Sequence, residues 1–476
     1  MSDRVRIPTQ GLPAERLLTD LAAMKTGDAD YKGGRTFSLV YYVDDAHHEM
    51  LQRAAGMFLA ENGLNPMAFQ SLRRLESDVV QMTASMLNAP ATAAGTLSSG
   101  GTESILLAIK TYRDRARRKW PWIRNPKIVL PATAHPAFDK AGHLFDVRLD
   151  HVPVDADGAV DVAKMRRRID RNTIALVASA PQYPHGTLDP IPEIGALAEK
   201  HKLPLHVDAC FGGFVLPWLE RLGVPMPQWD FRVPGVTSIS ADVHKYGYAP
   251  KGASVILYRD RSLLRHQFYV RTGWVGGIYA SPSLPGSRPG APIATAWAAM
   301  RSLGESGYLE LAKKAWEAAE RLRAAIRGTP GLKLLGLPHS TIVTWASDDP
   351  AVDVYAIADQ LAAKGWHVDR QQDPPSVHCS MNATNLPSLD AYVADLRAAV
   401  DFVRAHPEAS TSGEAAMYGM MAKIPVGMVV REAVLDVLED LYAPKDSGEA
   451  KKEGPPPWMG KALGTIHQVE AWWQGR

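Results

Sequence analysis

The stretch Ser238-Ile-Ser-Ala-Asp-Val-His-Lys-Tyr-Gly-Tyr-Ala-Pro-Lys-Gly252 decides the fold class of this 476-residue chain. It joins two short apolar runs, Val236–Ile239 and Ser254–Tyr258, which we predict to be neighbouring buried strands. The connection between them carries too many functional groups for a plain hairpin. We predict that packing removes part of the hydration of Lys245, which lowers the pKa of a lysine and exposes a nucleophilic amine. A solvated lysine in a polar loop is the alternative, since most lysines are exposed.

The composition is that of an ordinary water-soluble protein, with 46% hydrophobic and 22% charged residues. A formal net charge of +2 provides no broad basic surface for a nucleic acid. The two cysteines, Cys210 and Cys379, have no metal-ligand spacing and favour a reducing compartment. The N-terminus lacks a signal-peptide pattern, and no stretch approaches the ~18 apolar residues of a membrane span. We therefore expect a soluble, cytoplasmic protein with no metal site and no nucleic-acid partner.

Short apolar runs alternate with helical patterns over the middle of the chain, which predicts an α/β fold with a largely parallel sheet. Ligands of such sheets bind beyond the carboxyl ends of the strands. The predicted strands are Lys127–Leu130, Ile174–Ser179, Pro204–Val207, Val236–Ile239 and Ser254–Tyr258. The predicted helices include Ser71–Leu87, Asp161–Ile169 and Ile191–His201.

The chain divides by pattern into four segments. Residues 1–70 are an N-terminal arm with a helical pattern at Ala14–Met24, and residues 71–291 are the large α/β domain. Residues 292–442 read as a smaller α+β domain, and residues 443–476 as a flexible segment and tail. In the third segment we predict helices at Ala294–Leu303, Tyr308–Arg327, Asp353–Lys364 and Leu389–Arg404, and strands at Leu332–Leu335 and Ser340–Trp345.

Polar motifs follow three of the predicted strands. His135 lies after the first strand, Tyr183 lies in Ala180–Gly186 after the second, and Asp208 directly follows the third. A carboxylate at the end of an apolar run is costly to bury unless it is paired. Asp208 therefore requires a cation or a protonated nitrogen at that level of the sheet.

A glycine-rich turn, Leu97-Ser-Ser-Gly-Gly-Thr-Glu103, opens a helical pattern. The free N–H groups and positive dipole at such a helix start can bind a phosphate. The turn lacks the spacing of a dinucleotide fingerprint and of a P-loop. By itself it fits a plain capped turn as well as an anion site.

These features together match the needs of pyridoxal phosphate, which requires a phosphate anchor, an acid at the pyridine nitrogen and a lysine amine. Gly101 and Thr102 would hold the phosphate, and Asp208 would keep the ring nitrogen protonated. Lys245 would condense with the aldehyde, and His135 could lie flat against the ring. A dehydrogenase or an ATPase would not need this set, so the combination favours the catalytic interpretation of Lys245.

The same motifs resemble the sphingosine-1-phosphate lyase family, which lies among the group II pyridoxal phosphate-dependent decarboxylases. The resemblance covers roughly residues 35–440. Ser238–Gly252 is its most specific part, whereas the Gly-Gly-Thr-Glu and His-Lys motifs alone fit any group II member. The segments that carry the resemblance are Ser98–Ser104, Thr133–Lys140, Ala180–Gly186, His206–Gly213, Ser238–Gly252, Gly276–Pro282 and Gly286–Gly290.

The resemblance implies a fold-type I homodimer with a mostly parallel seven-stranded-type sheet and shared active sites. It implies that Ser287 reaches the partner subunit's cofactor phosphate next to His244. It also implies cleavage of a phosphorylated sphingoid base to a fatty aldehyde and phosphoethanolamine. By similarity, the residues around the substrate would be Tyr41, Asn65, Tyr183, Lys251 and Tyr418, with Tyr183, Tyr418 and Tyr41 among the catalytic residues. A packing or interface role is the alternative for these side chains.

Two departures from the family pattern bear on the substrate and on the location of the protein. Eukaryotic members carry an N-terminal membrane-spanning segment, which this chain lacks, so it resembles a bacterial-type soluble form. The family's Asn-Pro-Leu-His segment reads Asn65-Pro-Met-Ala68 here, without the histidine that contacts the substrate's polar head. An amino-acid decarboxylase of the same fold, acting on an aromatic or acidic amino acid, remains the alternative activity. A cofactor-free scaffold and a secreted effector are the more distant ones.

Overall fold

The computed structural model describes residues 5–411, 415 and 427–442. Its main feature is a seven-stranded sheet with the order β1-β7-β6-β5-β4-β2-β3. Strands β3, β2, β4, β5 and β6 run parallel, while β7 is antiparallel to both of its neighbours. The strands are β1 Ala94–Ser98, β2 Lys127–Pro131, β3 Arg148–Val152, β4 Thr173–Ser179, β5 Leu205–Asp208, β6 Val236–Ala241 and β7 Ser254–Tyr258.

The prediction of a largely parallel α/β sheet is confirmed, and the five predicted strands are β2, β4, β5, β6 and β7. Strand β4 is buried along its whole length, as its continuous apolar sequence requires. The two strands of the large sheet that were not predicted have weaker patterns. β1 contains small residues, and β3 is a partly exposed edge strand that carries Arg148 and Asp150.

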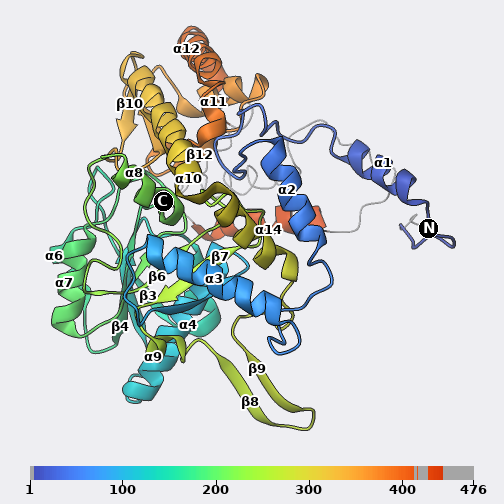
Figure 1. The fold of residues 1–476 in the computed structure, drawn as a ribbon. Helices are drawn as coiled ribbons and strands as arrows, with labels where there is room; N and C mark the ends of the chain where they lie inside the picture. The colour runs from blue at the N-terminus through green and yellow to red at the C-terminus, as the bar shows by residue number, and fades with distance from the viewer. Residues whose placement is uncertain (1–4, 412–414, 416–426, 443–476) are drawn as a thin grey trace.

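Helices cover both faces of the large sheet (Figure 1). The alternation along β7 shows how the core is divided, because Ile256 packs with α4 and α5 while Val255 and Leu257 pack into the core on the opposite face. The helices are α1 Ala14–Met24, α2 Asp45–Gly56, α3 Gln70–Met86, α4 Gly101–Lys119, α5 Ala137–Phe145, α6 Val162–Arg168, α7 Ile191–His201, α8 Leu216–Arg221, α9 Arg261–Leu264, α10 Gly290–Arg327, α11 Val354–Ala363, α12 Leu389–Ala405 and α14 Gly427–Tyr442. Three 3₁₀ helices lie at Gly212–Phe214, Ala383–Asn385 and Pro407–Thr411.

A second, antiparallel sheet has the order β10-β11-β13-β12 and its own hydrophobic core with α10, α11 and α12. Its strands are β10 Leu332–Leu335, β11 Ile342–Ser347, β12 Asp369–Gln372 and β13 Pro375–Ser380. The first two of the four helices predicted in this region are two parts of α10, which breaks at Gly304, where the backbone has a φ of 58°. Helix α10 thus runs from the large sheet to the small one (Figure 1).

Two segments project from the main body in Figure 1, namely α1 and the hairpin of β8 (Tyr269–Trp274) and β9 (Gly277–Ser281). Helix α1 has no buried residue, and the hairpin exposes the apolar side chains of Trp274, Val275 and Ile278. Among the described residues, no helix is long and apolar enough to cross a membrane. The predicted tail at 443–476 and the predicted site residue Tyr418 lie outside the described residues.

Candidate active site

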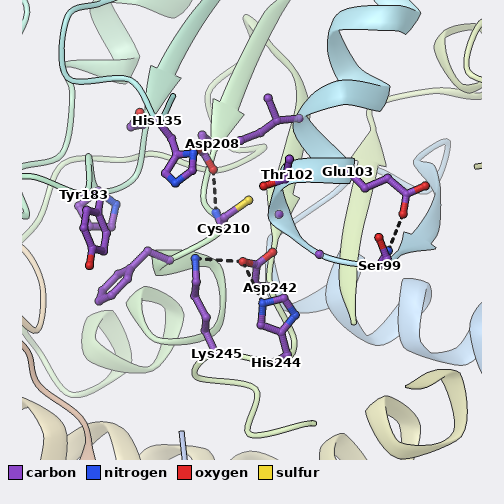
Figure 2. Close-up of a pocket in the computed structure, with 16 residues that line it drawn as sticks. Ser99, Thr102, Glu103, His135, Tyr183, Asp208, Cys210, Asp242, His244 and Lys245 are labelled. Carbon is purple, nitrogen blue, oxygen red and sulfur yellow. Dashed lines mark hydrogen bonds and ion pairs between the residues drawn. The ribbon is translucent and has the colours of Figure 1, made fainter. Parts of the chain in front are cut away.

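A cavity of about 340 Å³ opens at the carboxyl ends of the central parallel strands. This is where ligands bind to open α/β sheets. Seven of the residues predicted from the sequence line it: Gly101, Thr102, His135, Tyr183, Asp208, His244 and Lys245. Figure 2 shows the side chains of Thr102, His135, Tyr183, Asp208, His244 and Lys245 around this cavity, at the end of β5 and in the segments that follow β1, β2, β4 and β6.

Lys245 lies in the turn that follows β6, and its Nζ is 3.0 Å from Oδ2 of Asp242 (Figure 2). Burial by itself lowers the pKa of Lys245. The negative charges of Asp242 and, further away, Asp208 outweigh that effect, so the pKa is raised. The prediction of a lowered pKa for Lys245 is therefore wrong. Lys245 is a charged, ion-paired amine that must lose a proton before it can act as a nucleophile.

Asp242 also lines the cavity, although no role was predicted for it from the sequence. It is only 2% exposed and also lies 3.5 Å from Nε2 of His244. Burial opposes ionisation of Asp242, but Lys245 and His244 keep its pKa below the usual value. Its position, directly after the apolar strand β6 and three residues before the lysine, is the same strand-end signal that identified Asp208.

Asp208 ends β5 and is 7% exposed. Its Oδ1 accepts hydrogen bonds from the backbone N–H of Cys210, at 3.0 Å, and from the hydroxyl of Ser240, at 3.2 Å. These two donors fix the orientation of the carboxylate at the floor of the cavity. They leave room for a further interaction with a protonated nitrogen of a bound ring.

The glycine-rich turn opens α4, as predicted, and joins it to β1, a strand that was not predicted. A Cβ atom on Gly101 would lie 2.8 Å from Asp242 Oδ2 and from Cys210 Sγ, so a larger residue would clash there. Glu103 accepts the backbone N–H of Ser99, at 2.7 Å, and that of Leu284, at 2.9 Å. The turn is thereby held open toward the cavity, with the first N–H groups of a 19-residue helix beside it.

Tyr183 and His135 form the other side of the cavity. The hydroxyl of Tyr183 donates to Oδ2 of Asp369, at 2.9 Å, and its ring stacks on His378 with centroids 4.1 Å apart. Burial, and then the charge of Asp369, raise the pKa of Tyr183. His135 accepts the backbone N–H of Ala137 at Nδ1, which fixes its ring at the start of α5.

Tyr41 and Lys251 lie beside this cavity but are not among the residues that line it. The ring of Tyr41 is 4.8 Å from that of Tyr246, and the Nζ of Lys251 is 5.3 Å from the Tyr41 ring. Lys251 also donates to the carbonyl of His244, at 3.3 Å. Protein atoms around its ammonium group, together with the charge of Lys245, lower the pKa of Lys251 to about 8.

Two predicted site residues are not brought to this cavity. Ser287 is exposed, and its hydroxyl accepts a hydrogen bond from Asn62 at 3.1 Å. Asn65 accepts the backbone N–H groups of Met67 and Ala68, so its side chain caps a local turn. Within a single chain, therefore, neither residue contacts the converging groups around Lys245.

The chemistry of the cavity fits pyridoxal phosphate. A helix N-terminus suits the phosphate, the Asp208 carboxylate suits the ring nitrogen, and Lys245 suits the aldehyde. Two buried polar atoms beside them, Oδ1 of Asp242 and Nδ1 of His244, have no hydrogen-bond partner within the described ranges. Unpartnered polar atoms in a cavity indicate a place for a polar ligand.

Comparisons with known proteins point to the same chemistry. Residues 44–346 match the family described as the pyridoxal-dependent decarboxylase conserved domain. The chain is 43% identical to sphingosine-1-phosphate lyase of Arabidopsis thaliana over 444 residues, which cover 92% of this chain and 81% of that protein. Sphingosine-1-phosphate lyase 1 of Rattus norvegicus is 41% identical over 95% of this chain and 80% of its own length.

Solved structures extend the likeness to three dimensions. A sphingosine-1-phosphate lyase of Burkholderia pseudomallei superposes with a TM-score of 0.84 at 40% identity, covering 93% of this chain and 98% of that one. A glutamate decarboxylase of Lactobacillus brevis superposes with a TM-score of 0.74 at 21% identity, covering 84% and 95% of the two chains. The second likeness concerns the fold alone.

Proposed function

Because this chain belongs to the sphingosine-1-phosphate lyase family of pyridoxal-dependent decarboxylases, we propose that it cleaves phosphorylated long-chain sphingoid bases. The reaction would break the C2–C3 bond of a 2-amino-3-hydroxy base in the retro-aldol sense. A fatty aldehyde and phosphoethanolamine would be released. The observation that carries the proposal is the convergence of Lys245, Asp208 and the Gly101–Thr102 turn in one cavity of a chain so similar to these lyases.

The cofactor is pyridoxal phosphate, which, when bound, accepts the electron pair that is released as the carbon–carbon bond breaks. We propose that Lys245 holds it covalently and that Gly101 and Thr102 bind its phosphate. Asp208 would keep the ring nitrogen protonated, which makes the ring a better electron acceptor. His135 would pack against the ring.

On the substrate side, we propose that Lys251 and Tyr41 bind the polar head. Lys251 is partly charged near neutral pH and lies against Tyr41, so the two present a cation and an aromatic hydroxyl together. Ala68 stands where the family pattern has a histidine, and the Asn65 side chain caps its own turn. Lys251 would therefore carry more of the phosphate recognition here. Tyr418 stays a proposed site residue that lies outside the described residues.

We further propose a cytoplasmic homodimer in which Ser287 contributes to the partner subunit's phosphate site. The exposure of Ser287 and of the apolar β8–β9 hairpin that precedes it supports this arrangement. The buried free thiols of Cys210 and Cys379 suit a reducing compartment. Sedimentation of the holoenzyme tests the dimer, and a monomer with full activity would contradict it.

The test of function is incubation of the holoenzyme with matched phosphorylated and unphosphorylated long-chain bases, followed by detection of the aldehyde. We expect aldehyde from the phosphorylated base only, and none from the Lys245→Ala variant. The same preparation is given a panel of aromatic and acidic amino acids. Release of carbon dioxide from that panel, without aldehyde from the lipid, would assign the protein to the amino-acid decarboxylases instead.

A further inference from the structure

Tyr183, which lines the cavity of the large sheet, is connected to the small sheet by a hydrogen bond. Tyr183 follows β4 of the large sheet, whereas Asp369 is the first residue of β12 of the small one. The Tyr183 hydroxyl donates to Asp369 Oδ2 at 2.9 Å, and His378 of the adjacent strand β13 covers one face of the Tyr183 ring. The phenol is thus held in one orientation by two residues of the small sheet.

This orientation limits what Tyr183 can do to a substrate. Its proton points at Asp369, so its oxygen lone pairs are free to accept a hydrogen bond from the cavity. Since burial and Asp369 both raise the pKa of Tyr183, the tyrosinate is not accessible near neutral pH. Tyr183 can therefore take a proton from a substrate hydroxyl only if it gives its own proton away in the same step.

We propose that Asp369 is a positioning residue that receives the Tyr183 proton when Tyr183 accepts the proton of the substrate's 3-hydroxyl group. The inference rests on the proposed lyase function. In this step the substrate O–H bond breaks and a Tyr183 O–H bond forms. The former Tyr183 O–H bond breaks and the Asp369 Oδ2–H bond forms. The electron pair left on the substrate oxygen forms the aldehyde C=O as C2–C3 breaks, and bound pyridoxal phosphate would supply the acceptor for the electron pair of that bond.

The titratable groups around Asp369 are uncharged at pH 7. The titratable groups that face it are Tyr41 and Tyr183 from the N-terminal and large-sheet side, and His378 and Cys379 from β13. Burial lowers the pKa of His378 far below its usual value and raises that of Cys379 to about 12, so both are neutral at pH 7. Asp369 itself is partly exposed, which lets it return the proton to water or to the product.

The first test is a double-mutant cycle with Asp369→Asn and Tyr183→Phe, assayed by aldehyde release. Asparagine preserves the shape and a hydrogen-bond acceptor but cannot take the proton. We expect each single variant to lower kcat about 100-fold or more with little change in KM, in the range usual for general acid–base residues. We expect the double variant to be no slower than Tyr183→Phe. The relay would be overturned if Asp369→Asn kept the wild-type kcat. It would also be overturned if the loss of kcat in the double variant were the product of the two single losses.

The second test needs no substrate. The full chain is labelled with 3-fluorotyrosine, and the ¹⁹F resonance of Tyr183 is assigned by its absence from Tyr183→Phe. We expect Asp369→Asn to lower the titration midpoint of that resonance, because it removes the negative charge that raises the pKa of Tyr183. The exposed Asp401→Asn on α12 serves as the control and should leave the midpoint unchanged. An unchanged midpoint in Asp369→Asn would overturn the pairing itself.

The two tests separate two failures. If the wild-type protein releases no aldehyde from any phosphorylated base while the Tyr183 midpoint still moves, the lyase function is wrong and with it the relay. If the wild type cleaves the base but the cycle shows no coupling, the function stands and the relay is wrong.

Discussion

The two ends of the 242–251 loop place their lysines in opposite electrostatic environments. Lys245 faces Asp242 at 3.0 Å, and its pKa is raised. Lys251 lies on the ring of Tyr41 with no carboxylate in an ion pair in the described part of the chain, and its pKa falls to about 8. Lys245 is half-buried and Lys251 is exposed, yet nearby protein atoms remove hydration from both ammonium groups. Loss of hydration therefore does not explain why their pKa values shift in opposite directions. The nearest charged group makes the pKa values of the two lysines differ.

We expect the two lysine side chains to have different functions. The ion pair keeps Lys245 at one place beside the cofactor site, where it must be deprotonated to react. The lowered pKa of Lys251 makes its charge sensitive to pH near the physiological range. In the proposed function, the lysine that would bind the substrate phosphate by charge and the lysine that would react with the cofactor aldehyde lie six positions apart in one loop.

The largest expected effect comes from removing each lysine in turn. Lys245→Ala should abolish the visible absorption band of the bound cofactor and reduce turnover by several orders of magnitude, since covalent attachment is lost. Lys251→Ala should keep the band and lose mainly affinity for the phosphorylated base. Absorption spectra with and without borohydride, together with kcat and KM, distinguish them. A Lys245→Ala variant that kept both the band and turnover would refute the assignment.

A smaller effect is expected when the charge difference between the two ends of the loop is removed. In Asp242→Asn the opposing negative charge is gone, and burial dominates the pKa of Lys245. That pKa should therefore fall by roughly 1–3 units, as is usual for the loss of a close opposite charge. Competitive labelling of the cofactor-free protein with acetic anhydride across a pH series measures both lysines, with Lys251 as the internal reference. The midpoint for Lys245 should move toward that of Lys251. If it stayed in place, Asp242 would not be the cause of the raised pKa.

The sequence predicts those residues of the site that can be recognised from their place at the end of a strand or at the start of a helix. The Gly101 turn is predicted because it opens a helical pattern. Asp208 is predicted because it directly ends a strand, and parallel strands bring such residues to one edge. Asp242 satisfies the same criterion, so its role could have been predicted from its place before Lys245. The prediction of a lowered lysine pKa failed because it considered burial without that charge.

Other features depend on pairs that are distant in sequence, and no local pattern reveals them. Tyr183 and Asp369 are 186 residues apart, and Asp369 reads as an ordinary polar residue of a short strand. The strands β1 and β3 were missed for a different reason. Small residues in β1 and an exposed, charged edge in β3 weaken the apolar pattern on which strand prediction depends.

The smallest predicted effect concerns the pH dependence of substrate affinity. Lys251 has a pKa of about 8, below the usual value for lysine, so its charge is present below that pH and is lost as the pH rises through it. If Lys251 binds the substrate phosphate, KM should rise roughly tenfold from pH 7 to pH 9.5, since a hydrogen bond to a charged group contributes about 1.5 kcal/mol. Lys251→Arg keeps its charge over this range and should flatten the profile. A wild-type KM that stayed constant would place the phosphate elsewhere, whereas a rise that persisted in Lys251→Arg would assign the titration to another group.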